Sequence, residues 1–113
     1  LTTDAPRDNQ GRGESFSPTD LVATALGSCM ATIMGIAAAG RGLDLAGMAV
    51  TVEKEMIADP ERRIRSLTVE IRLPRPLGPR DRAALEIAAR HCPVHKSLHP
   101  AVEIPIRFVY PAE

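Results

Sequence analysis

The sequence lacks tryptophan and contains few aromatic residues, only two phenylalanines and one tyrosine among 113 residues. Proteins that bind single-stranded nucleic acid stack its bases on aromatic side chains, and this chain offers few of them. It also lacks a charge excess, because 14 Lys and Arg residues balance 14 Asp and Glu residues. A balanced chain has no overall field to attract nucleic acid or an anionic membrane, so neither is expected as a partner.

Long hydrophobic runs and cysteine frameworks are missing as well. No uninterrupted apolar stretch reaches the roughly 18 residues of a transmembrane helix, and no secretory signal pattern is present. Two cysteines are too few for the disulfide framework of a small secreted domain, so a cytoplasmic location is the default expectation. The chain also lacks Ser-His-Asp, phosphate-loop and dinucleotide-binding patterns.

A long helix is predicted over residues 18–39. Ser17 is a favourable N-cap, Pro18 suits the first helical position, and Asp20 stands where the acid of a capping box is found. Gly40 is expected to end the helix as a left-handed C-cap.

This helix carries no charged residue between Asp20 and Arg41, where the sequence reads LVATALGSCMATIMGIAAAG. A helix that is apolar or small on every face is expected to be buried on every face. One chain of this length has little material to cover such a helix. The sequence therefore predicts a homodimer whose protomers wrap around each other's central helices.

Alternating apolar and polar residues predict two strands at 46–58 and 63–73. The turn residues DPER at 59–62 join them as a β-hairpin. An amphipathic helix is expected over 80–92 and a short one from Pro93, where proline suits the first turn. The closing segment VEIPIRFVY predicts an edge strand, because Pro105 cannot donate to a ladder. The fold class is α+β, with an antiparallel sheet beside the long helix.

The two cysteines are open to several interpretations. Cys29 lies within the long helix and could be a small buried hydrophobe. Cys92 precedes Pro93 and would be the N-cap of the short helix, where backbone amides and the helix dipole favour a thiolate. His91 and Lys96 could add positive charge nearby.

A metal site is a further alternative, because the segment HCPVHKSLH supplies Cys92 and three histidines. Cys29 could add a second thiolate. Structural zinc sites usually show two paired ligand knuckles, whereas here there is one. Thiol chemistry is therefore the more specific hypothesis. The histidines are better explained as solvated surface residues than as metal ligands.

Taken together, SPTDLVATALGSCMATIMGIAAAGRGLDL and the later CPVHKSL resemble the OsmC/Ohr family of thiol-dependent peroxidases. The resemblance extends from Ser17 to Tyr110 and includes the order of hairpin, helices and last strand. It implies an intertwined homodimer with the cysteine-bearing helices at its centre. It also implies a single OsmC-like domain over residues 1–113 that lacks the family's N-terminal strands.

The same resemblance implies a mechanism for the two thiols. Cys29 would attack an organic hydroperoxide and become a sulfenic acid, and Cys92 would condense with it to a disulfide. An external dithiol would reduce that disulfide, with no cofactor or metal required. The apolar helix around Cys29 would favour lipid-like or aromatic hydroperoxides. These properties suit a role in the response to oxidative stress.

Two helper residues also follow from the resemblance. Family peroxidases pair an acidic residue near the start of the long helix with an arginine from the N-terminal strands. The matching position here is Thr19, and the acid, Asp20, comes one residue later. Arg12, in the polar loop expected over 4–16, is the candidate for the arginine.

A non-enzymatic member of the same fold is the alternative function. In that case an apolar pocket would bind a small hydrophobic ligand, and the cysteines would respond to redox conditions or serve only in packing.

Overall fold

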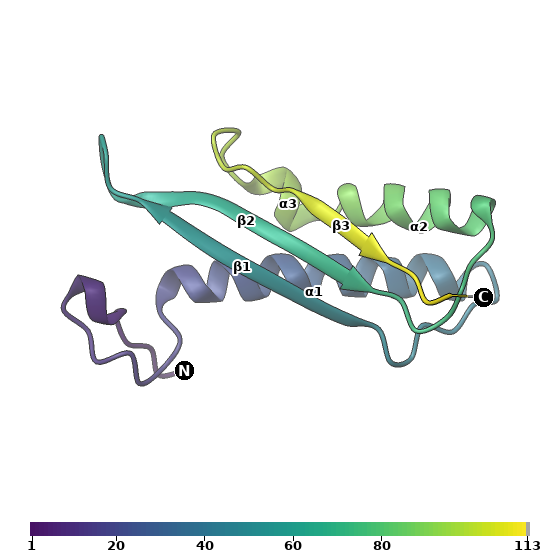
Figure 1. The fold of residues 1–113 in the computed structure, drawn as a ribbon, viewed down its shortest axis with the longest axis horizontal. Helices are drawn as coiled ribbons and strands as arrows, with labels where there is room; N and C mark the ends of the chain where they lie inside the picture. The colour runs from purple at the N-terminus through teal and green to yellow at the C-terminus, as the bar shows by residue number, and fades with distance from the viewer. Residues whose placement is uncertain (113) are drawn as a thin grey trace.

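The computed structural model describes residues 1–112, which form a long helix, a three-stranded sheet and two shorter helices (Figure 1). In chain order the elements are a 3-10 helix η1 (Arg7–Asn9), α1 (Pro18–Ala39), β1 (Ala49–Ile57), β2 (Arg63–Arg72), α2 (Pro79–Arg90), α3 (Pro93–Ser97) and β3 (Ile106–Val109). The α+β class and the helix over 18–39 are confirmed. The loop expected over 4–16 differs from expectation only in its short turn η1.

The start of α1 has the predicted capping box. The Ser17 hydroxyl accepts a hydrogen bond from the Asp20 backbone N–H at 3.1 Å, and the Asp20 carboxylate accepts one from the Ser17 N–H at 3.0 Å. These bonds satisfy donors that the first turn of a helix leaves without partners.

The predicted end of α1 is wrong in one detail. Gly40 keeps right-handed helical geometry with φ −65°, and the left-handed residue is Gly42 with φ 71°. The N–H of Leu43 then donates to the Ala38 carbonyl at 2.9 Å, as in a Schellman motif. Gly42 is the residue that needs glycine's freedom, since φ in this range is strained for other side chains.

The sheet has the order β1-β2-β3. β1 and β2 pair antiparallel, which confirms the hairpin, and β3 lies at an edge as Pro105 suggested. The expectation of a wholly antiparallel sheet is wrong, because β3 pairs parallel with β2. The chain crosses over through α2 and α3 between these strands, and a crossover of this kind returns the last strand in the same direction.

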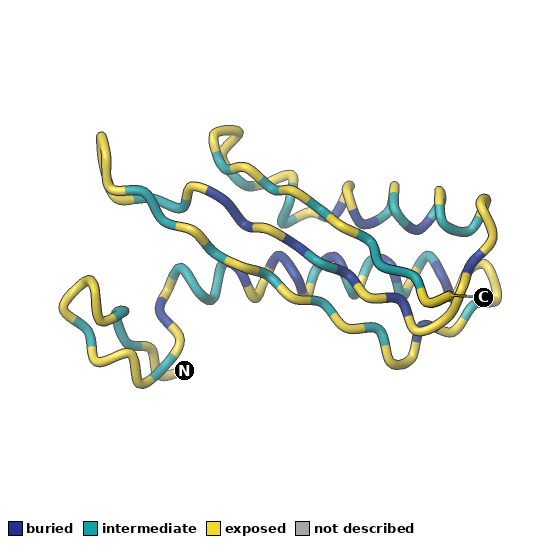
Figure 2. The backbone as a smooth tube through the Cα atoms, viewed as in Figure 1, coloured by how far each residue is buried: buried dark blue, intermediate teal, exposed yellow. Residues whose placement is uncertain are grey.

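The core lies between α1, the inner face of the sheet and α2 (Figure 2). The predicted alternation on β2 is confirmed, because Leu67, Val69 and Ile71 are all fully buried. Gly27 lets α1 approach β1 closely: a Cβ at this position would come within 3.0 Å of Val52 Cγ2. The largest buried side chains of this cluster on the helices are Leu26, Met30, Met34 and Leu85.

The opposite face of α1 is uncovered in the single chain. Thr24, Ser28, Thr32 and Ile36 are exposed, and Ile36 retains 65% of its accessible surface. Burial on every face is therefore not achieved by one chain alone. By length and composition α1 could also cross a membrane, but the core helix of a soluble protein meets the same criteria.

Candidate active site

Cys29 lies midway along α1 at the margin of the buried face. Its side chain is half-buried and packs against the hydrophobic core. Val22 and Ile33, on the same stripe of the helix, are also half-buried. The thiol is therefore set in apolar surroundings but keeps a route to solvent.

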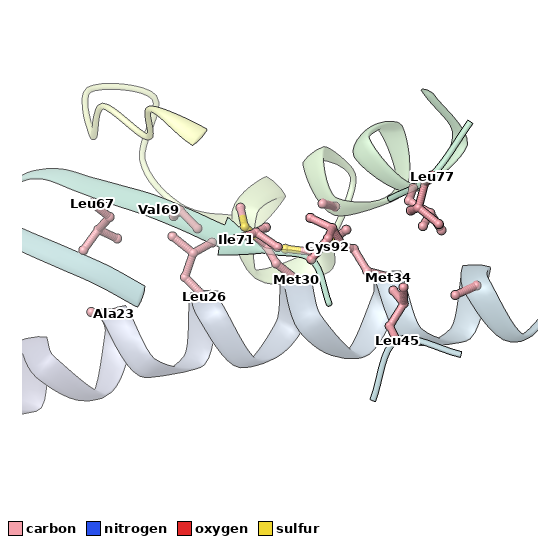
Figure 3. Packing of buried hydrophobic residues seen from close by; sticks show 14 residues of the cluster. Ala23, Leu26, Met30, Met34, Leu45, Leu67, Val69, Ile71, Leu77 and Cys92 are labelled. Atoms are coloured by element: carbon pink, nitrogen blue, oxygen red, sulfur yellow. The ribbon is translucent and has the colours of Figure 1, made fainter. Parts of the chain in front are cut away.

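Cys92 is the N-cap of α3, as its position before Pro93 predicts. Its side chain is 0% exposed and belongs to the core, where Figure 3 shows it among side chains of α1 and β2. The Cys92 Sγ accepts a hydrogen bond from the His95 backbone N–H at 3.4 Å. The buried thiol is thus held by the start of α3.

The structure brings the two thiols together, because α3 packs against α1. Both cysteines are free, and burial raises the pKa of the Cys92 thiol. Interaction with the Cys29 side chain raises this pKa as well, whereas hydrogen bonds from the backbone amides of His95 and Val94 oppose the increase. The site therefore pairs a half-buried thiol with a fully buried one whose burial disfavours the thiolate.

Asp20 lies elsewhere on α1. It stands roughly two and a half helical turns before Cys29, so the two side chains leave the helix on opposite sides. Its carboxylate lies 2.7 Å from Lys54 Nζ. The hydrogen bond from Lys54 and that from the Ser17 N–H lower the pKa of Asp20. Asp20 thus caps α1 and joins it to β1, and its expected role as a helper stays a prediction.

Arg12 lies in the N-terminal loop, which Figure 1 shows beside the start of α1 and away from α3. Its side chain is exposed. The backbone of Arg12 fixes the loop, with its N–H donating to the Asp4 carboxylate at 3.1 Å and its carbonyl accepting from Arg7 Nε at 3.1 Å. Arg12 is therefore not brought to Asp20 in this chain, and its expected role as a helper also stays a prediction.

Lys54 is the basic partner that the sequence analysis missed. Its ammonium group also donates to the Thr19 hydroxyl at 2.9 Å and to the Ser17 hydroxyl at 3.4 Å. The sequence pattern contained an indication of this partner, because Lys54 lies on the same face of β1 as Val50 and Val52. A lysine at an apolar position of an amphipathic strand indicates a partner on the facing element.

An open groove of about 620 Å³ lies between α1 and β1, and Cys29 does not line it. Its lining is mixed, with Val50 and Val52 beside the Asp20–Lys54 pair. The lining residues are Phe16, Asp20, Ala23, Thr24, Gly27, Ser28, Ala31, Met48, Val50, Val52 and Lys54. The groove and the thiol pair are thus separate features.

The metal hypothesis gains no support from the geometry. Within residues 1–112, no three His, Cys, Asp or Glu side chains are grouped to hold an ion. The His91 ring bonds the Ile87 carbonyl, and the His99 ring accepts from the Ala101 N–H. Both rings therefore serve local turns of the chain.

Residues 11–107 match the family model of the OsmC-like proteins. The chain is also similar to a crystal structure described as an osmotic stress induced and detoxification response protein from Psychrobacter arcticus 273-4. That comparison gives 45% identity and a TM-score of 0.88, covering 94% of this chain and 77% of the other. No curated protein sequence matches the chain.

More distant structures share the fold. An organic hydroperoxide resistance protein from Legionella pneumophila has 21% identity and a TM-score of 0.79, with 96% of this chain and 80% of that one covered. An organic hydroperoxide resistance protein from Bacillus subtilis has 16% identity and a TM-score of 0.69, with 83% and 70% covered.

Proposed function

Because the chain belongs to the OsmC-like protein family, we propose that it is a thiol-dependent peroxidase that reduces organic hydroperoxides through Cys29 and Cys92. The observation that supports this most strongly is the pairing of a half-buried thiol on α1 with the buried thiol at the start of α3. Structural relatives named for organic hydroperoxide resistance agree with this substrate class.

The reaction has three steps. The Cys29 thiolate attacks the terminal peroxide oxygen, the O–O bond breaks, and the organic product leaves as an alkoxide that takes a proton to become an alcohol. Cys92 then attacks the sulfenic sulfur of Cys29, which forms the disulfide and releases the hydroxyl group as water. An external dithiol supplies two electrons and two protons to restore both thiols.

The division of roles follows from burial. A hydroperoxide must reach the attacking sulfur, and Cys29 is the more accessible of the two. Cys92, at 0% exposure, is shielded from bulk oxidants but lies beside Cys29. The apolar residues around Cys29 favour lipid-like or aromatic hydroperoxides over hydrogen peroxide. A cytoplasmic location stays a prediction.

Turnover of cumene hydroperoxide with dithiothreitol as the reductant tests this function. The wild-type protein should consume the hydroperoxide catalytically, and Cys29→Ser should abolish consumption. Cys92→Ser should react once and then proceed to sulfinic acid. Ser28→Ala is the matched control, because Ser28 neighbours Cys29 in sequence but lines the groove, and it should retain turnover. Absence of dithiol-dependent turnover in the wild-type protein would refute the proposal.

The homodimer is also proposed, on the basis of the uncovered face of α1. Thr24, Ser28, Thr32 and Ile36 form an exposed stripe without charge, and the groove adjoins it. A second copy would remove this surface from water. Light scattering should give the mass of a dimer for the wild-type protein and of a monomer for Ile36→Glu. A wild-type monomer would contradict this assignment.

A non-enzymatic binding role is the second candidate, and the groove between α1 and β1 is the observation that favours it. A small apolar ligand would contact Val50 and Val52 there, away from the thiols. Titration with the fluorescent apolar probe 8-anilinonaphthalene-1-sulfonate tests it. Binding should survive in Cys29→Ser and Cys92→Ser, and loss in either variant would argue against this role.

A further inference from the structure

We propose that recycling of the oxidised protein has a fixed direction: the external dithiol attacks the sulfur of Cys29, and Cys92 leaves as a thiolate held by the start of α3. This inference rests on the proposed function, because it concerns the disulfide formed in that cycle. It assigns a role to α3, and to the His95 backbone N–H in particular, that the peroxidase step does not need.

Access to the two sulfurs is unequal. A thiolate must approach a disulfide sulfur along the line of the S–S bond, so the attacked sulfur has to be open to solvent. Cys29 is half-buried and keeps part of its surface accessible, whereas Cys92 is 0% exposed and packed in the core. An attack on Cys92 would require the start of α3 to move away from α1 first, because Cys92 is the buried N-cap of that helix.

The two sulfurs also differ in their hydrogen-bond donors. Cys92 Sγ accepts the His95 N–H at 3.4 Å, and the amides of His95 and Val94 both favour its thiolate. Cys29 lies within α1, where backbone N–H groups are occupied by the helix's own hydrogen bonds. Backbone N–H groups can therefore stabilise a leaving thiolate at Cys92, whereas the helix offers no free N–H group to a leaving thiolate at Cys29.

Because Cys92 is buried, the departure of its thiolate depends more strongly on the α3 amides. Removal from water raises the pKa of Cys92, which would slow its departure as a thiolate. The α3 amides act against that penalty because a hydrogen bond to the charged form stabilises it. His95 is thus a positioning residue through its backbone.

The exchange balances in two steps. One thiolate of the dithiol bonds to Cys29 Sγ while the Cys29–Cys92 bond breaks and its electron pair goes to Cys92. The second thiol of the dithiol then attacks the mixed disulfide, releases the Cys29 thiolate and closes the reductant's own disulfide. The two protons of the dithiol end on Cys29 and Cys92.

Peptide mapping of a trapped mixed disulfide tests the direction. The wild-type protein is oxidised with diamide, which forms the disulfide without any peroxidase step, and is exposed briefly to glutathione. After an acid quench and unfolding, free thiols are alkylated with N-ethylmaleimide. Glutathione on Cys29 with maleimide on Cys92 is the expected product. Glutathione on Cys92 in half or more of the adducts, or failure of diamide to link the two cysteines, would overturn the proposal.

A parallel oxidation with cumene hydroperoxide separates this proposal from the peroxidase function. If only diamide forms the disulfide, the peroxidase proposal fails while the mapping of the adduct still decides the direction of reduction. If both oxidants form it, the same mapping applies to the product of the proposed catalytic cycle.

A pair of variants tests the role of the α3 amide. His95→Pro removes the backbone donor at the third residue of α3. Loss of one hydrogen bond to a charged group should slow reduction of the disulfide by dithiothreitol about tenfold. Ser97→Gly weakens α3 at its other end, where the Ser97 hydroxyl bonds the Pro93 carbonyl at 2.7 Å, and should leave the rate within about twofold. Equal rates in the wild type and His95→Pro, or equal slowing in both variants, would refute this role.

Discussion

The lifetime of the proposed sulfenic acid on Cys29 should depend steeply on pH, because Cys92, the proposed resolving thiol, is buried. An ordinary cysteine, with a pKa of about 8.5, is only about 3% thiolate at pH 7. Burial raises the pKa of Cys92, so its thiolate is scarcer still. Since the thiolate is the nucleophile, the resolving rate should rise about tenfold per pH unit between about pH 6 and pH 8.

Intact mass spectrometry after rapid mixing measures this lifetime. The reduced protein receives one equivalent of cumene hydroperoxide at several pH values and is quenched with acid at increasing times. The species that has gained one oxygen should convert to the species that has lost two hydrogens, and faster at higher pH. In Cys92→Ser the oxygen adduct should persist at every pH. A wild-type lifetime that does not change with pH would refute the assignment of a buried, protonated thiol as the resolving group.

Two further predictions concern the packing that positions α1. In a double-mutant cycle, Lys54→Met and Asp20→Asn should show a coupling of about 0.5 kcal/mol in urea unfolding at pH 7, because solvent screens the partly exposed carboxylate. The pKa of Asp20 is lowered in the folded state. The coupling should therefore be fully present at pH values above the ordinary pKa of an aspartate, near 3.9, and should vanish as the pH falls through the lower pKa of the folded state. A coupling that stays unchanged at low pH would contradict the ion pair. Gly27→Ala should be about 1–3 kcal/mol less stable than Gly35→Ala, because a Cβ at Gly27 crowds Val52 whereas a Cβ at Gly35 meets no atom within 4 Å. Both substitutions gain the same helix propensity, so equal stabilities would contradict the close approach of α1 to β1.

Features set by neighbouring residues could be predicted from the sequence. The Ser17–Asp20 capping box depends on residues within one helical turn, and the sequence gives its pattern directly. The alternation of Leu67, Val69 and Ile71 likewise records which face of β2 is buried. The N-cap position of Cys92 followed from the proline after it.

Features that depend on distant contacts could not be predicted in the same way. The direction of β3 is set by a crossover through two helices, and its sequence pattern is the same for parallel and antiparallel pairing. The partner of Asp20 was expected in the loop, at Arg12, but Lys54 reaches it from β1 across the α1–β1 contact. At the end of α1, Gly40 and Gly42 were both available, and only the backbone geometry distinguishes them.

The juxtaposition of the thiols is the feature of the site on which the proposed chemistry depends. Sequence separation places Cys29 and Cys92 on different helices, and only the packing of α3 against α1 makes them neighbours. The family resemblance implied a pair, and the structure adds its asymmetry, with one thiol half-buried and the other fully enclosed. The proposed roles in attack, resolution and recycling follow from that difference.

The most direct test of the thiol pair is the intact mass of the reduced protein after one equivalent of cumene hydroperoxide, combined with a count of free thiols. The account predicts a rapid loss of two hydrogens per chain, with both Cys29 and Cys92 no longer reactive and peptide mapping showing them linked within one chain. Slow reaction, or oxidation confined to one of the two thiols, would contradict the claim that they form a working peroxidatic pair.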